Sequence, residues 1–253
     1  MSGKPLTDVV EEAKRVLKAS ADKGIILRLL GGLAIRLHCP SATHRSLKRK
    51  YPDIDLVGLS KQGELIEKLF DELGYIPNKK FNALHGTERL QFGEMINERI
   101  VDIILDKFKM CHKLDLRKRL EIDDLTVSLA DLLLTKMQVI KLNEKDVRDV
   151  IALLRDHELG NTDGDKETIN VDYIVTVCSK DWGWYKTIST NLRSVLQLLP
   201  SYRLKKSDEE EVTKKIDQIL KSIEEKPKSI KWKLRDLIGE KMKWWTEVEE
   251  VVR

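Results

Sequence analysis

The sequence predicts an α/β (α+β) protein, in which a domain with a mixed sheet flanked by helices is followed by a helical C-terminal domain. Strand-like and helix-like stretches alternate up to residue 108, whereas helical apolar spacing dominates after Ser128. Within this second part, the polar stretch GNTDGDKETIN lacks apolar periodicity and contains two glycines. We therefore predict a first domain over residues 1–159, a linker over 160–170 and a helical domain over 171–253.

The composition is that of a globular protein with a charged surface. Of the 253 residues, 41% are hydrophobic and 35% are charged, and the net charge of +4 is too small to establish a nucleic-acid partner. No apolar run approaches the roughly 18 residues of a membrane span, and the N-terminus lacks a signal-peptide core, so we expect a cytoplasmic protein without membrane contact. Cys39, Cys111 and Cys178 form no CxxC pair and indicate neither a disulfide framework nor a zinc site.

The first elements follow from capping residues and glycines. Thr7 is a candidate cap for a helix with apolar residues at spacings of three and four, and Gly24 ends that helix. The run IILRLL, residues 25–30, predicts a mostly buried strand. The pair Gly31-Gly32 then turns the chain into the short helix LAIRLH.

Three more strands and several helices follow. YPDIDLVG predicts a second strand, and KQGELIEKLFDELG predicts a helix with one apolar face that ends at Gly74. ERLQFG and RIVDIILDKF predict two strands joined as a hairpin by EMINE. From Ser128 to residue 157 the pattern is helical, with a break at Leu142-Asn143.

Two aspartates on the second predicted strand are candidate metal ligands. Asp53 and Asp55 lie two residues apart, so their carboxylates share one strand face with Cα atoms about 6.5–7 Å apart. Mg²⁺ prefers hard oxygen ligands and is usually held by one or two protein carboxylates together with substrate phosphates. The alternative is an ordinary exposed strand on which both acids are solvated.

The glycine pair favours the metal-nucleotide interpretation. Glycines at a strand-to-helix turn let the backbone approach a phosphate and direct helix N-terminal amides at it. Together with PDIDLVG, this turn resembles the signature of the nucleotidyltransferase superfamily typified by DNA polymerase beta, although the loop CPSATHRSLKRKY is an insertion between the two motifs. The resemblance implies a third carboxylate on a neighbouring strand, for which we assign Asp102, with Asp106 on the same face as the reserve.

A narrower resemblance covers roughly residues 25 to 155. LADLLLTKMQVIKLNEKDVRDVIALL is similar to the abortive-infection toxin nucleotidyltransferases, in which a helical lysine precedes a lysine-aspartate pair and a further aspartate; here these are Lys136, Lys145-Asp146 and Asp149. An arginine-serine pair of that family is missing. The resemblance implies that Lys136 holds the triphosphate and that Asp146 accepts a hydrogen bond from the nucleotide or fixes the lysine. The alternative is that both are solvated residues on an amphipathic helix.

The expected activity is transfer of a nucleoside monophosphate from a nucleoside triphosphate such as ATP to an acceptor hydroxyl on RNA or tRNA, a protein or a small molecule. Two Mg²⁺ ions would be held by Asp53, Asp55 and Asp102, with Gly31 and Gly32 positioning phosphates. A toxin-antitoxin role follows from the narrower resemblance alone. The acceptor and the oligomeric state stay open, as does a catalytically silent nucleotide-binding or antitoxin-like protein.

The basic segments leave a third alternative, an RNA-binding protein. HRSLKRK, residues 44–50, would lie near a triphosphate or an RNA backbone, and KPKSIKWKLRDLIGEKMKWW interleaves lysines with tryptophans in a pattern that can bind single strands. Helical spacing argues for packing instead. It predicts a buried stripe with Trp232 opposite it, made of Ile230, Leu234, Leu237, Ile238, Trp245 and Val248.

Overall fold

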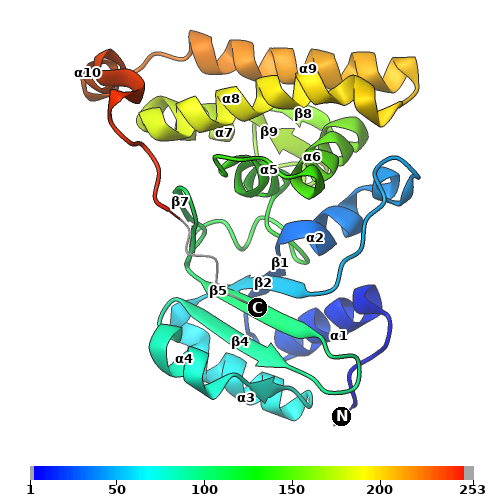
Figure 1. Cartoon of the computed structure of the whole chain (residues 1–253). Helices are drawn as coiled ribbons and strands as arrows, with labels where there is room; N and C mark the ends of the chain where they lie inside the picture. The colour runs from blue at the N-terminus through cyan, green and yellow to red at the C-terminus, as the bar shows by residue number, and fades with distance from the viewer. Residues whose placement is uncertain (1–2, 248–253) are drawn as a thin grey trace. The chain divides into compact units, whose positions relative to one another are not determined.

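The computed structural model describes residues 3–247 and confirms the mixed α/β fold class (Figure 1). The chain forms two compact units. Of the described residues, 3–37, 50–108 and 114–128 form the first unit, and 38–49, 109–113 and 129–247 form the second. Within residues 3–247, no helix combines the length and the apolar character needed to cross a membrane.

The first unit is built on a five-stranded mixed sheet with the order β1-β2-β5-β4-β3. Its strands are β1 (Leu27–Leu29), β2 (Ile54–Gly58), β3 (Ile76–Pro77), β4 (Arg89–Gly93) and β5 (Ile100–Leu105). β2 and β5 are parallel, and the other neighbouring pairs are antiparallel. The predicted β4–β5 hairpin is therefore confirmed. A separate two-stranded sheet joins β6 (Lys107–Lys109) and β7 (Lys113–Asp115).

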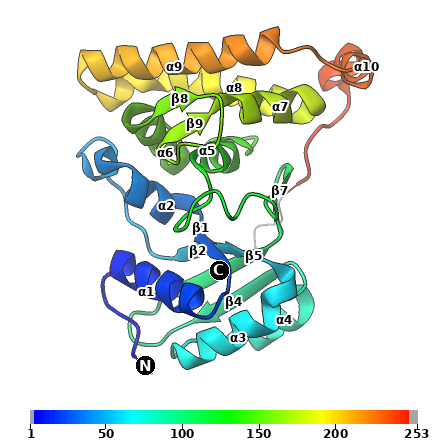
Figure 2. The ribbon, with the colours of Figure 1, turned by 180° about the vertical axis from the view of Figure 1, so that it is seen from behind.

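Two helices cover one face of this sheet. They are α1 (Val9–Asp22) and α3 (Gly63–Glu72), which lie on the same side of the strands in both views (Figures 1 and 2). The short helix α4 (Lys79–His85) packs against β4. Phe70 of α3 stacks on Phe92 of β4 with ring centroids 4.5 Å apart, so Phe92 faces the helices. Phe92 pairs with Val101, whereas Asp102 is the next residue along β5. Because side chains alternate along a strand, Asp102 points to the opposite face.

Asp8, and not Thr7, caps α1. The Asp8 side chain accepts hydrogen bonds from the backbone N–H groups of Val10 and Glu11. Both Thr and Asp are good caps, and the carboxylate additionally favours the positive end of the helix dipole. Gly24 follows the end of the helix with φ +68°, as its predicted role requires.

A buried carboxylate ties α1 to the loop before it and to the end of α3. Glu12 is fully buried and accepts hydrogen bonds from Arg15 (2.7 and 2.8 Å), the Tyr75 hydroxyl (2.6 Å) and the Leu6 backbone N–H (2.9 Å). Burial alone would raise the pKa of Glu12, but these hydrogen bonds outweigh it and lower the pKa below its ordinary value of 4.5. The charged form of Glu12 is therefore part of the stability of this unit.

The second unit is mainly helical. Its helices and short strands are α5 (Leu129–Met137), α6 (Glu144–Asp156), β8 (Glu158–Gly160), β9 (Thr168–Asn170), α7 (Val171–Lys180), α8 (Trp182–Leu198), α9 (Lys206–Glu225) and α10 (Ile230–Ile238). The break predicted at Leu142-Asn143 is confirmed, since Asn143 caps α6 by accepting from the Asp146 N–H. The helix α2 (Gly31–His38) ends at His38, which is the first residue of the second unit.

The contacts divide the chain differently from the predicted domain boundaries. Nearly every residue of α5 is buried, so this helix needs partners on all sides, and it packs against α6, α7 and α8. Residues 129–159, which we assigned to the first domain, therefore group with the helices that follow them. The predicted linker 160–170 carries the ends of β8 and β9, which pair in parallel.

The prediction for the C-terminal stripe is wrong in its orientation. Trp232 is only 8% exposed, and its indole N–H donates to the Cys178 carbonyl at 3.0 Å. The aliphatic residues of the predicted stripe are exposed instead, namely Ile230, Leu234, Leu237 and Ile238. Trp245 is half-buried, and Val248 lies outside the described residues. Helical spacing identified the aliphatic face of α10, but the side that packs is the one with Trp232. Its indole buries more apolar surface than an aliphatic side chain, and its N–H has a hydrogen-bond partner.

Candidate functional site

Two aspartates lie in register on the face of the sheet opposite α1 and α3, and a third directly precedes one of their strands. Asp55 on β2 and Asp102 on β5 are direct partners in the parallel register, which places their strands about 4.8 Å apart at this point. Asp53, predicted to lie on the same strand as Asp55, is in the bend just before β2. We call Asp53, Asp55 and Asp102 the acidic face.

Arg89 of β4 binds the carboxylate of Asp102. Its Nε and Nη2 donate to the two oxygens of Asp102, which is 4% exposed. The hydrogen bonds to Asp102 raise the pKa of Arg89 above its ordinary value, and the negative charge of Asp55 raises it further. Arg89 was not among the site residues predicted from the sequence. It could have been found in the predicted hairpin, because it lies diagonally across from Asp102 on the same face.

Gly31 lies directly beside Asp55 at the turn from β1 into α2. It has φ +67°, and a Cβ atom at this position would lie 2.6 Å from Oδ2 of Asp55. The backbone N–H of Leu30 donates to the Asp55 carbonyl at 2.9 Å, which fixes the turn against β2. Gly31 is thus required both by its backbone conformation and by its neighbour. Gly32 is the buried second residue of α2.

Asp106 has a different environment from Asp102. It follows the end of β5 with φ +64°, and its carboxylate accepts hydrogen bonds from the Ser60 backbone N–H (3.0 Å) and hydroxyl (2.7 Å). These bonds hold the turn that begins at Ser60. Asp106 therefore has a structural partner of its own, while Asp102 is the acid in register with Asp55.

The predicted nucleotide-binding residues of the helical stretch lie in the second unit and form a buried ion-pair network. Nζ of Lys136 lies 2.8 Å from Asp149 and 3.2 Å from Asp146. Arg49 also binds Asp149 with two hydrogen bonds of 2.8 and 2.7 Å. Asp149 is 2% exposed. The side chains of Lys136 and Asp146 are only 12% and 14% exposed, so the alternative that these two are solvated residues on an amphipathic helix is wrong. We call Lys136, Asp146, Asp149 and Arg49 the Lys136 network.

The basic segment 44–50 contributes to a cavity in the second unit. Arg45 lines this cavity of about 740 Å³ together with Arg148 and Arg203, and Glu144 is its one acidic lining residue. Arg148 is engaged by Glu144 (2.6 Å) and by the Lys48 carbonyl (2.7 Å). The lining is predominantly positive, which suits an anionic group.

The donor set of the acidic face fits a magnesium ion. Carboxylate oxygens are the ligands that Mg²⁺ prefers, and the acidic face offers two carboxylates in register on adjacent strands and a third just before β2. A carboxylate has about four lone-pair sites, so Asp102 retains acceptor capacity after it has bound Arg89.

Comparisons with known proteins show a structural similarity and no sequence match. No family model matches the chain, and no curated protein sequence matches it. The chain is similar to the crystal structure of the lincosamide antibiotic adenylyltransferase LnuA bound to lincomycin, with 14% sequence identity and a TM-score of 0.38. The match covers 55% of this chain and 92% of that one. The role of the acidic face is therefore inferred from its own geometry.

Proposed function

We propose that the protein is a metal-dependent nucleotidyltransferase that moves a nucleoside monophosphate from a nucleoside triphosphate to an acceptor hydroxyl. One observation carries this proposal: Asp55 and Asp102 are in register on adjacent parallel strands, with Gly31 packed against the Asp55 carboxylate at the start of a helix. This arrangement combines cation ligands with a backbone turn that can approach phosphate.

The chemistry is displacement at the α-phosphorus. The acceptor oxygen forms a bond to this phosphorus, the bond to the oxygen bridging the α- and β-phosphates breaks, and pyrophosphate leaves while the acceptor loses its proton. Two Mg²⁺ ions, when held by Asp53, Asp55 and Asp102, would stabilise the charge on the attacking acceptor oxygen and on the leaving pyrophosphate oxygen.

The residues of this chain have distinct tasks in the proposal. Asp55 and Asp53 supply ligands from β2, and Asp102 supplies a ligand whose orientation is fixed by Arg89. Gly31 keeps the start of α2 free of a side chain, so that the backbone amides there can bind phosphate oxygens. Removing the carboxylate of Asp55 or Asp102 should therefore affect turnover more than folding.

The Lys136 network has an additional proposed role in binding the triphosphate. Lys136 carries a charge that phosphates attract, but the carboxylates of Asp146 and Asp149 already engage it. Asp146 would fix this lysine, and a nucleotide would share its ammonium group with the two acids.

The proposal can be tested by incubating the protein with Mg²⁺, cell extract and one nucleoside triphosphate at a time. Each of the four nucleotides carries a label at the α-phosphate. We expect label to move to RNA, to protein or to a small metabolite, which also identifies the acceptor, and Asp55→Asn to abolish the transfer. Asp106→Asn is a matched control, because asparagine tolerates the left-handed backbone that Asp106 adopts. Absence of transfer with all four nucleotides, or transfer undiminished in Asp55→Asn, would contradict the proposal.

A further inference from the structure

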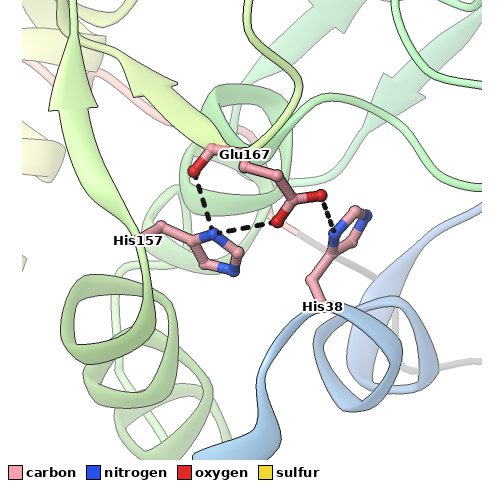
Figure 3. A group of neighbouring side chains, drawn as sticks. All are labelled: His38, His157 and Glu167. Carbon is pink, nitrogen blue, oxygen red and sulfur yellow. Dashed lines mark hydrogen bonds and ion pairs between the residues drawn. The ribbon is translucent and has the colours of Figure 1, made fainter.

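A group of two histidines and one glutamate lies in the second unit, apart from the acidic face and the Lys136 network. His38 is the last residue of α2, His157 caps the end of α6, and Glu167 directly precedes β9. One ligand atom of each lies within 4.8 Å of the others. Figure 3 shows both imidazole rings beside the Glu167 carboxylate. We call these residues the His–Glu cluster.

The local backbone fixes two members of the cluster against each other. β8 and β9 are parallel with Glu158 opposite Thr168, so the preceding residues, His157 and Glu167, meet where this pairing begins. Nδ1 of His157 lies 3.0 Å from the Glu167 carbonyl oxygen and 3.5 Å from its carboxylate (Figure 3). The strand pair therefore positions both side chains independently of any ligand.

The hydrogen bond of His157 leaves its second nitrogen available. Donation from Nδ1–H to the Glu167 carbonyl makes Nε2 the unprotonated nitrogen of the neutral ring. Among the described residues, Nε2 has no hydrogen-bond partner, although His157 is only 4% exposed. A buried lone pair without a donor is unfavourable, and a metal ion is one group that would satisfy it.

His38 faces the same carboxylate from the other side. Its Nδ1 lies 3.9 Å from Glu167, and its ring centroid lies 5.9 Å from that of His157. The separation of 3.9 Å between Nδ1 of His38 and the Glu167 carboxylate is close to that between two ligands of a metal bound at about 2.0–2.2 Å. Nδ1 of His157 faces Glu167, so a turn of the imidazole ring that brings Nε2 toward the same carboxylate would complete the coordination.

The surroundings of the cluster favour a cation. Two helices end at His38 and His157, and helix C-termini carry partial negative charge. The ammonium of Lys215, which donates to the His157 carbonyl, is itself paired with Glu158 and Glu211.

We propose that His38, His157 and Glu167 bind a divalent transition-metal ion of the zinc class. Imidazole nitrogens suit such ions, whereas Mg²⁺ and Ca²⁺ prefer oxygen ligands throughout. The ion would join the end of α2 to the start of the β8–β9 pair and would keep a coordination position for water. This inference does not depend on the proposed nucleotidyl transfer.

The test is binding of Zn²⁺ and Co²⁺ to the full chain in the presence of excess Mg²⁺, with a competing chelating dye. We expect one ion per chain, and a loss of affinity in Glu167→Gln that exceeds the roughly 10- to 100-fold effect of removing an outer-shell partner. Glu167 is exposed, so this variant does not disturb the core, and His157→Gln should weaken binding as well. The exposed His85 provides the control His85→Gln, which should bind as the wild type does.

Two further measurements separate this site from other zinc-binding groups. Zn²⁺ should raise the melting temperature of the wild type but not that of Glu167→Gln, because only the folded wild type holds the complete ligand set. The Co²⁺ complex should show no thiolate charge-transfer absorption. Failure of the wild type to bind stoichiometrically, equal affinity in Glu167→Gln, or thiolate absorption from a cysteine would each overturn the proposal.

Discussion

Gly31 and Gly24 offer a controlled test of the acidic face. Both have a left-handed backbone, with φ +67° and φ +68°, but they differ in what an added side chain would meet. A Cβ atom at Gly24 would have nothing within 4 Å, whereas one at Gly31 would lie 2.6 Å from Oδ2 of Asp55. Substitution by alanine thus imposes the same backbone strain at both positions and a steric conflict at only one.

The two effects have different magnitudes and different readouts. Left-handed backbone costs a non-glycine residue about 1–2 kcal/mol, so Gly24→Ala and Gly31→Ala should both lose roughly this much stability. At Gly31, the Asp55 oxygen must also retreat from 2.6 Å to at least the 3.4 Å of ordinary contact. A displacement approaching 1 Å at a reacting centre can reduce turnover about 100-fold, or about 2.7 kcal/mol of barrier.

Urea unfolding and labelled-nucleotide transfer, measured on both variants below their melting temperatures, provide the assay. We expect similar losses of unfolding free energy, near-normal turnover in Gly24→Ala and about 100-fold lower turnover in Gly31→Ala. Equal turnover in the two variants would refute the claim that Gly31 keeps Asp55 in its working position. A selective loss of stability in Gly31→Ala with normal turnover would assign the glycine to folding alone.

Three more predictions concern charged side chains. Asp102→Asn should reduce turnover by several orders of magnitude, while Asp106→Asn should stay within about tenfold, a barrier change below roughly 1.4 kcal/mol; the reverse order in parallel kinetics would move the third ligand to Asp106. Lys136→Met should raise the Michaelis constant for the nucleotide. It should also lower the free energy of unfolding in urea by about 3 kcal/mol, because it leaves buried Asp149 without one of its partners. A loss of unfolding free energy under about 1 kcal/mol would indicate a solvated lysine. The lowered pKa of Glu12 means that its contribution to stability is present above pH 4.5 and is lost as the pH falls through the lower folded-state value. Glu12→Gln should therefore be less stable at neutral pH and lose less stability on acidification, and an unchanged pH profile would exclude this role.

The sequence predicted those elements whose own residues determine them. The strands at residues 54–58, 89–93 and 100–105 and the helix at 63–72 follow from apolar periodicity and flanking glycines. The strand pair β8–β9 was missed because three residues per strand carry no periodic pattern. The grouping of α5 and α6 with later helices was missed because periodicity shows that a face is apolar and not which element covers it.

The candidate site could also be predicted only in part from the sequence. The spacing of Asp53 and Asp55 predicted one strand face, but only Asp55 lies on β2, and Asp53 is in the bend before it. The neighbouring strand was expected from a family resemblance. Two other features depend on tertiary structure. Arg89 contacts Asp102 through the register of β4 on β5, and Lys136 is buried through contacts with residues ten or more positions away.

The acidic face also explains why a stable sheet tolerates acids in direct register. Like charges opposite each other on neighbouring strands are destabilising, and Asp102 is almost fully buried. Arg89 offsets this by binding Asp102, while the apolar residues that alternate with the acids, such as Ile54 and Val101, bury themselves against the helices on the other face. One face therefore packs against the helices, and the other carries the carboxylates of Asp55 and Asp102 in register. Carboxylate oxygens are the ligands that a hard divalent cation prefers, which is the physical basis for the proposed metal binding at this face.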